Sequence, residues 1–168
     1  MRHYAVQLLD SLRHIHTLNF VHKDIKLENV LLDKDFNLKL TDFGLADKVE
    51  GSDASGFEKE RFDGTFSYMA PEILLGAPFS GQAADLFAFG VILFALYCGH
   101  MPFNVASEQD PCYEKICKRN LTEFWDIHCR DKPEGFFSQD FIDLISNLLA
   151  FQPYMRLNLA EIVGHPWF

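Results

Sequence analysis

The sequence is short of basic residues, and this shortage limits the partners that the chain can bind. Its 168 residues contain 15 lysines and arginines against 24 aspartates and glutamates, which gives a formal net charge of −9 at pH 7 and a pI of about 5.1. An acidic chain is a poor partner for nucleic acid or for an anionic membrane, because both carry charge of the same sign. A basic partner or substrate suits this charge, and ordinary solubility explains it equally well.

Cysteine is also scarce, and its spacing excludes the usual metal and redox motifs. The four cysteines show neither C-x-x-C spacing nor a nearby pair of histidines: Cys98, Cys112, Cys117 and Cys129. Unpatterned thiols are typical of proteins kept in a reducing compartment, so we expect free thiols and a cytoplasmic location. The N-terminal residues lack the continuous apolar stretch of a signal peptide, which agrees with that expectation.

No apolar run is long enough to predict a helix that spans a membrane. The best candidate, residues 86–99, has 14 uncharged residues and meets His100 and Pro102 before it reaches the about 20 residues that a span requires. A helix that is apolar on all sides is otherwise a buried central helix, so we expect a core helix here. Repeats, low-complexity tracts and linkers are lacking too, which predicts one domain over residues 1–168.

The pattern along the rest of the chain is mostly helical. Apolar residues at helical spacing predict an amphipathic helix over residues 2–17 and another after residue 138. Three sets of residues are typical of helix starts, and we expect them to cap helices: Asp110 with Pro111, Ser138, and Asn158 with Glu161.

Four chemically useful side chains lie close together in one short segment, VHKDIKLENVLLD and the nine residues after it. They are a carboxylate, an ammonium, an amide and a second carboxylate: Asp24, Lys26, Asn29 and Asp42. Phosphoryl transfer from ATP uses such a set, because it needs a residue that orients the attacking hydroxyl, a cation for the transferred phosphate and two oxygen ligands for Mg²⁺. The alternative is a polar loop with turn-forming residues, and the full spaced set favours the phosphoryl-transfer interpretation.

The local pattern predicts a β-hairpin that brings two of these side chains together. Residues 30–32 are apolar and β-prone, residues 33–35 are typical of a turn, and residues 36–40 alternate apolar and polar. Asn29 comes just before the first strand and Asp42 just after the second, so both fall at the open end of an antiparallel hairpin. Two oxygen donors without a soft ligand nearby suit a hard ion, which indicates Mg²⁺.

The same segment resembles the catalytic loop of eukaryotic protein kinases, whose signature is H-R-D-x-x-x-x-N followed by D-F-G, with Lys23 where arginine is usual. Lys26 and Thr65 point to the Ser/Thr type, and the overall pattern is similar to calcium/calmodulin-dependent kinases. The resemblance continues along the chain at four places: Gly64–Glu72 as the end of an activation segment, Asp85–Gly90 as the start of the central helix, Arg156 as the late arginine, and His165–Phe168 as a frequent end of Ser/Thr kinase domains.

The resemblance implies a mainly α fold with a small β-hairpin, which is the large C-terminal lobe of the kinase fold without the N-terminal β lobe. Neither G-x-G-x-x-G nor Val-Ala-x-Lys precedes Asp24. We therefore expect a partial kinase domain, inactive as the isolated fragment, with the small lobe as its missing partner. The alternative is a non-catalytic binding or scaffold module, and the retention of all four chemical residues favours the kinase.

The resemblance also assigns roles to the residues of the segment. Asp24 would orient the substrate hydroxyl and accept its proton, and Lys26 would stabilise the γ-phosphoryl charge. Asn29 and Asp42 would hold Mg²⁺, and Leu31 would form the floor of the adenine site of ATP. The protein substrate would offer a Ser or Thr hydroxyl. Basic residues around that hydroxyl would suit the acidic charge of this chain.

Further residues receive supporting roles from the same resemblance. Thr65 would bridge Asp24 and Lys26, and Asp85 would anchor the backbone of the catalytic loop. The remaining assignments are a packed column at the Asp-Phe-Gly turn (His22, Phe43 and Gly44), a structural ion pair (Glu72 with Arg156), and an arginine contact in the substrate (Glu28, for which a solvated glutamate is an equal alternative).

Two departures from the family pattern concern regulation. Arg61 stands where many relatives carry a phosphothreonine, and Lys23 stands where they carry the arginine that receives the phosphate. Lysine lacks the planar fork with which arginine grips a phosphate at two points. We therefore expect this segment to be ordered without phosphorylation there, by pairing of Lys23 or Arg61 with a nearby acidic residue: Glu58, Glu60 or Asp63.

Overall fold

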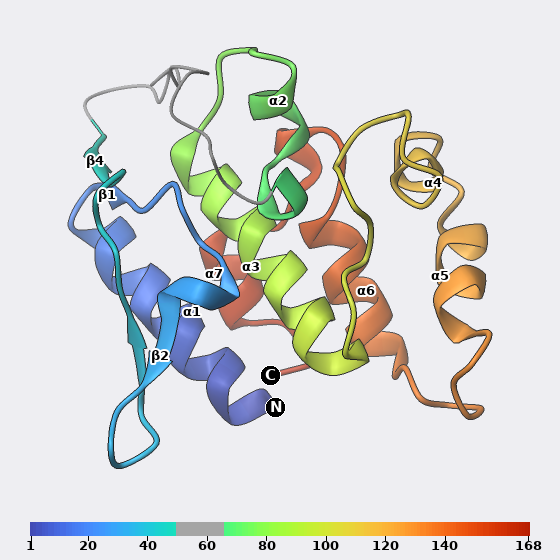
Figure 1. Cartoon of the computed structure of the whole chain (residues 1–168), viewed down its shortest axis with the longest axis horizontal. Coiled ribbons are helices and arrows are strands. Elements are labelled where there is room, and N and C mark those ends of the chain that lie inside the picture. The colour runs from blue at the N-terminus through green and yellow to red at the C-terminus, as the bar shows by residue number, and fades with distance from the viewer. Residues whose placement is uncertain (50–65) are drawn as a thin grey trace.

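The computed structural model describes residues 1–49 and 66–168, which form a mainly helical body with two small antiparallel strand pairs (Figure 1). The α-helices are α1 (Arg2–Thr17), α2 (Pro71–Leu74), α3 (Gly81–Cys98), α4 (Tyr113–Cys117), α5 (Leu121–Cys129), α6 (Gln139–Leu148) and α7 (Leu159–Val163). The strands are β1 (Phe20–Val21), β2 (Val30–Leu32), β3 (Leu38–Leu40) and β4 (Asp47–Lys48), and the 3₁₀ turns are η1 (Leu27–Asn29), η3 (Phe66–Tyr68) and η4 (Pro153–Met155).

The apolar helix α3 forms the centre of the molecule, as its composition predicts. It lies between α1 and the strand pairs on one side and α4 and α5 on the other (Figure 1), and it packs directly against α1 and α6. By length and composition alone α3 could cross a membrane, but 72% of this apolar helix is buried inside the body. Ser80 caps its start by accepting a hydrogen bond from the Ala83 amide, and Gly99 (φ +79°) ends it in the left-handed region that glycine adopts without strain.

A glycine allows α3 and α6 to approach closely. A Cβ atom placed on Gly90 would lie 2.7 Å from Cβ of Leu148, a distance that real side chains do not tolerate. Leu148 and the adjacent Leu149 are fully buried against this point. Gly90 therefore sets the spacing between the central helix and its main partner.

The predicted hairpin is present, and its turn explains why the second strand starts late. β2 and β3 pair in antiparallel register, with Val30 opposite Leu40. The carboxylate of Asp33 accepts hydrogen bonds from the backbone amides of Asp35 and Asn37, both at 2.9 Å, which closes the turn. Phe36 has φ +61° and belongs to this turn, so the strand begins at Leu38 rather than at the predicted residue 36.

The predicted helix caps are confirmed in two cases and shifted in the third. The Ser138 hydroxyl accepts from the Phe141 amide, and Asn158 forms a reciprocal capping box with Glu161. Asp110 also accepts amide hydrogen bonds, from Cys112 and Tyr113, but α4 begins only at Tyr113. Pro111 therefore lies in the turn before the helix and not at its first position, because the Asp110 carboxylate closes that turn by itself.

A buried ion pair connects α2 to the C-terminal part of the body. The guanidinium of Arg156 donates to both carboxylate oxygens of Glu72, at 2.7 and 2.6 Å, and to the carbonyl of Ala150 at 2.9 Å. It also lies over the ring of Phe87, 4.8 Å from the ring centre. Both charged side chains are almost fully buried. The structure thus brings together the two residues assigned to this ion pair.

Candidate active site

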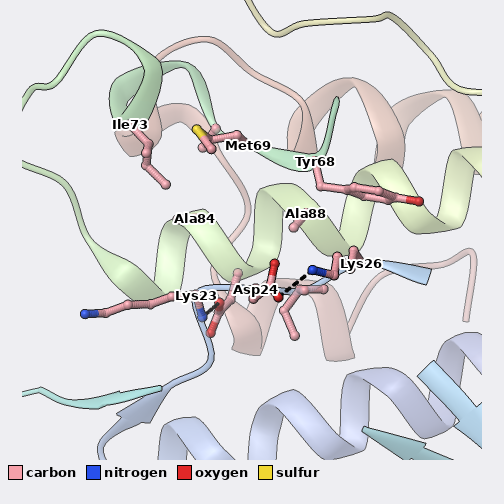
Figure 2. A pocket seen from close by; sticks show the side chains of 11 residues that line it. Lys23, Asp24, Lys26, Tyr68, Met69, Ile73, Ala84 and Ala88 are labelled. Atoms are coloured by element: carbon pink, nitrogen blue, oxygen red, sulfur yellow. Dashed lines mark hydrogen bonds and ion pairs between the residues drawn. The ribbon is translucent and has the colours of Figure 1, made fainter. Parts of the chain in front are cut away.

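Three of the four chemical residues meet at one carboxylate. The Lys26 ammonium donates to Oδ2 of Asp24 at 2.7 Å, as Figure 2 shows. The Asn29 amide donates to the same oxygen at 3.0 Å and to the backbone carbonyl of Asp24 at 2.8 Å. The turn η1 makes this possible, because it folds Asn29 back toward Asp24. One oxygen of Asp24 is thus fixed by two donors, which orients the carboxylate.

Asn29 and Asp42 lie at the same end of the hairpin. The backbone amide of Thr41 donates to the carbonyl of Asn29 at 2.9 Å, so Asp42 follows the residue that is bonded to Asn29. Asp42 has φ +61°, an uncommon conformation for a residue with a side chain, and its Oδ1 accepts from the Gly44 amide at 3.2 Å. The carboxylate of Asp42 is exposed. This left-handed turn directs the chain away from the hairpin directly after the ladder ends.

The donor atoms at this end fit a magnesium ion. The Asn29 nitrogen is engaged by Asp24, which leaves the amide oxygen for a ligand, and Asp42 contributes carboxylate oxygen. Over residues 1–49 and 66–168, no group of three or more histidine, cysteine or acidic residues is placed to hold a metal. Mg²⁺ commonly takes only one or two protein oxygens and fills its shell with water and phosphate oxygens, so a pair of ligands suits it better than Zn²⁺ or Ca²⁺.

A buried aspartate in α3 fixes the backbone of the loop. Oδ1 of Asp85 accepts from the Lys23 amide and Oδ2 from the His22 amide, both at 2.8 Å. The ring of His16 lies 2.9 Å from the same Oδ2. Asp85 is 1% exposed, and a carboxylate buried to this degree is tolerated only with such partners. The loop is therefore tied to the central helix just before Asp24.

His22 connects the loop to the Asp42-Phe43-Gly44 turn. Its Nδ1 accepts from the Asp24 amide at 3.3 Å, so the proton of the neutral ring is on Nε2, which donates to the Thr41 carbonyl at 3.0 Å. Its ring is fully buried and lies 4.8 Å from that of Phe43. His22 thereby holds the loop around Asp24 and the Asp42-Phe43-Gly44 turn in one arrangement.

A small cavity lies beside Asp24, and the motif pattern does not predict it. Its volume is about 40 Å³, and Figure 2 shows Tyr68, Met69 and Ile73 on one wall and Asp24 and Lys26 on the other. The sequence does carry a signal for this wall. Tyr68 and Met69 belong to the GTFSYMAPE stretch that resembles the end of an activation segment, and Ile73 directly follows it. Burial raises the pKa of the Tyr68 phenol, and the nearby Glu28 carboxylate raises it further. Tyr68 therefore lines this cavity as a neutral phenol.

The other assigned residues lie at the edge of the site or outside the described part. Leu31 on β2 and Phe43 are about half exposed, and Glu28 is exposed. Thr65 falls in residues 50–65, as do Arg61 and the acidic partners expected for it, so their roles stay predictions. Lys23 pairs with Asp47 on β4 at 2.9 Å, an acidic residue outside the set predicted for it.

The chain matches the family described as the protein kinase domain over residues 1–168, its whole length. It therefore belongs to the protein kinase domain family.

Its relatives include Ser/Thr kinases, several of the calcium/calmodulin-dependent kinase group. The chain is 34% identical to sperm motility kinase 3A of Mus musculus and to maternal embryonic leucine zipper kinase of Danio rerio, over 96% of its length in both cases. It is 36% identical to SNF-related serine/threonine-protein kinase of Homo sapiens over 98% of its length. It spans only 29%, 22% and 20% of these three relatives, respectively.

Proposed function

We propose that this chain is the catalytic lobe of a Ser/Thr protein kinase that transfers the γ-phosphoryl group of Mg·ATP to a protein hydroxyl. The observation that carries the proposal is the convergence of Lys26 and Asn29 on Asp24 beside the open end of the hairpin, where Asp42 follows. A binding or scaffold module has no physical need for an oriented carboxylate next to a pair of magnesium ligands.

Asp24 acts on the acceptor hydroxyl in this proposal. Its Oδ2 is held by Lys26 and Asn29, so its Oδ1 is the atom left to accept a hydrogen bond from the substrate. This hydrogen bond orients the hydroxyl in line with the γ-phosphorus, and Asp24 accepts its proton as the new P–O bond forms and the bond to the leaving ADP oxygen breaks. Lys26, within 2.7 Å of Asp24, is the cation that stabilises the charge on the transferred phosphoryl group.

Asn29 and Asp42 hold the nucleotide through its metal. Mg²⁺ held by these two oxygen ligands would neutralise charge on the phosphate oxygens of the nucleotide. Leu31 presents an exposed aliphatic side chain on β2, which suits the face of an adenine ring.

The substrate is a Ser- or Thr-containing protein segment, and the net charge of −9 favours one with basic residues. The exposed carboxylate of Glu28 gives such a segment a contact close to the site. The four cysteines are free thiols, which supports a cytoplasmic location for the reaction.

A small lobe is the partner that completes the nucleotide site in this proposal. The 168 residues contain no glycine-rich loop or Val-Ala-x-Lys ahead of Asp24, so these residues alone offer the phosphates only part of the contacts that kinases use. We expect the purified chain to bind Mg·ATP very weakly and to turn over negligibly.

The proposal is tested by restoring the missing contacts. In a chimera, this chain replaces the corresponding part of the SNF-related kinase domain, and transfer of labelled γ-phosphate to a basic Ser/Thr peptide library is measured. The chimera should phosphorylate the library, while Asp24→Asn should lower the rate by at least about 10³-fold with an unchanged melting temperature. A folded chimera no more active than its Asp24→Asn variant would favour the scaffold alternative.

A further inference from the structure

Lys23 makes one contact through its backbone and another through its side chain, and only the backbone contact belongs to the candidate active site. Its backbone amide is held by Asp85 on α3, while its ammonium reaches Oδ2 of Asp47 on β4 at 2.9 Å. Its φ of +67° directs the side chain away from Asp24 and Lys26, as Figure 2 shows. Lys23 therefore joins the central helix to the strand that follows Asp42-Phe43-Gly44.

The strand pair that Lys23 reinforces is very short. β4 pairs with β1 over two residues only, with Val21 opposite Asp47, and one further bond runs from the Val49 amide to the Asn19 carbonyl at 2.8 Å. A two-stranded ladder of this length is unstable by itself in water. A side-chain ion pair across the same two segments adds a bond that the ladder lacks.

The ion pair joins a mostly buried lysine side chain to an exposed carboxylate. The side chain of Lys23 is only 9% exposed, although that of Asp47 is 55% exposed. The pKa of the Asp47 carboxyl is lowered by the hydrogen bond and charge of Lys23 and also by the Lys48 amide. The hydrogen bond between the two charged groups is exposed to solvent, so the pair has the modest energy of a surface ion pair, and its effect should be local to the strand pair.

The segment between the hairpin and β4 is then fixed at both ends. On one side, Thr41 donates to the carbonyl of Asn29, and on the other side Asp47 is held by Val21 and Lys23. Residues 42–46 between these points turn tightly, with the Ala46 amide bonded to the Phe43 carbonyl at 3.1 Å. Movement of β4 would therefore move the Asp42 turn.

We propose that Lys23 and Asp47 are positioning residues, whose ion pair fixes the strand after Asp42-Phe43-Gly44 on the catalytic loop and so holds Asp42 near Asn29. The chain's own carboxylate supplies the negative charge, so that this part of the site is ordered without an added anion such as phosphate. The role of Asp42 as a metal ligand rests on the proposed function, whereas the ion pair and its effect on β4 do not.

The test uses amide hydrogen exchange of the 168-residue chain, read at the Val49 amide, whose bond to Asn19 closes the strand pair. Asp47→Asn keeps Oδ1 as the acceptor for the Lys48 amide and removes only the charge. We expect exchange at Val49 to become about three- to tenfold faster, with an unchanged melting temperature. Asp47→Glu keeps the charge and should exchange within about twofold of the wild type.

Charge reversal provides the rescue that separates an ion pair from a general packing effect. Lys23→Glu should speed exchange at Val49 as Asp47→Asn does, and the double variant Lys23→Glu/Asp47→Lys should restore most of the protection. The matched control is Lys48→Gln, which removes a cation from the next position of β4 and should leave exchange unchanged.

Inorganic phosphate tests the claim that no added anion is needed. At matched ionic strength, phosphate should leave Val49 exchange in the wild type unchanged. The proposal is overturned if Asp47→Asn exchanges like the wild type, if charge reversal does not restore protection, if Lys48→Gln has the same effect as Asp47→Asn, or if phosphate slows exchange in the wild type. None of these measurements involves ATP or a metal, so an inactive chimera would count against the proposed function and leave this result standing.

Discussion

At the scale of single residues, the buried charges divide into those that support the fold and those that support the site. Glu72 and Arg156 are buried against each other and touch no part of the cavity. Asp24 and its partner Lys26 are both partly exposed and line that cavity. Substitutions at these two places should therefore affect different properties.

Removal of one partner of the buried ion pair should destabilise the whole chain. Glu72→Ala or Arg156→Ala leaves an uncompensated buried charge, which should lower the free energy of unfolding by about 3–5 kcal/mol. Asp24→Ala should change it by less than about 1 kcal/mol. Urea denaturation of the three variants, read by circular dichroism, measures the difference. A normal unfolding midpoint for both ion-pair variants would refute their structural role.

His128 should make the stability sensitive to acid. Its ring is buried beside Phe94 and Phe124, and its Nε2 has no hydrogen-bond partner in the described part of the chain. Burial and the adjacent His100 lower the pKa of His128 from 6.5 to about 4. Below pH 6.5 the unfolded chain therefore binds a proton that the native chain does not bind, and stability falls as the pH approaches 4.

The size of this effect can be isolated with one variant. Between pH 7.5 and pH 5, His128 should account for a loss of about 2 kcal/mol in the free energy of unfolding. His128→Phe removes the titrating group and keeps an aromatic ring, so its loss over the same interval should be smaller by that amount. Equal losses in the two proteins would contradict the assignment.

At the scale of elements, the structure follows the sequence wherever one local signal decides the outcome. Ser138 and Asn158 cap helices at the predicted residues, and the apolar run is the core helix. The late start of β3 was less predictable, because the left-handed conformation of Phe36 depends on how Asp33 closes the turn. The pairing of β1 with β4 has no local signal at all, since each strand is two residues long.

The close packing of α3 on α6 gives a prediction at the same scale. Gly90→Ala would place a methyl group 2.7 Å from the Cβ atom of Leu148, so the helices must separate. We expect a loss of about 1–3 kcal/mol in the free energy of unfolding by urea denaturation. Gly164→Ala is the matched control, because a Cβ there would meet only backbone oxygens at 3.6 and 3.9 Å, and it should be nearly neutral. Equal effects of the two substitutions would show that Gly90 does not set the helix spacing.

At the scale of the whole molecule, the described residues form one apolar core around α3 and expose apolar side chains on the hairpin side. Its two termini lie side by side, with the guanidinium of Arg2 5.3 Å from the centre of the Trp167 ring (Figure 1). Leu31, Leu32 and Phe36 are 52%, 47% and 68% exposed. A surface of this kind commonly marks a contact with another protein part, which agrees with the proposed small lobe.

The positions of the site residues could be predicted from the sequence better than the contacts around them. The motif spacing was sufficient to place Asp24, Asn29 and Asp42 around one hairpin end, because a hairpin and a 3₁₀ turn fix short distances. The cavity at Tyr68 and Met69 and the Lys23–Asp47 pair depend on segments far apart in sequence. Their contacts are set by how the chain packs on α3, which periodicity does not reveal.

Asn29 and Asp42 should form one metal site, and Mn²⁺, a paramagnetic substitute for Mg²⁺, provides the test. Titration of Mn²⁺ into the isotope-labelled chain should broaden the amide signals of Thr41 and Gly44 first, and excess Mg²⁺ should reverse the effect. Asp42→Ala should abolish this broadening and leave the chain folded. If Mn²⁺ spares these signals, or broadens them equally in Asp42→Ala, the two residues do not share a metal and the kinase mechanism proposed for this chain is wrong.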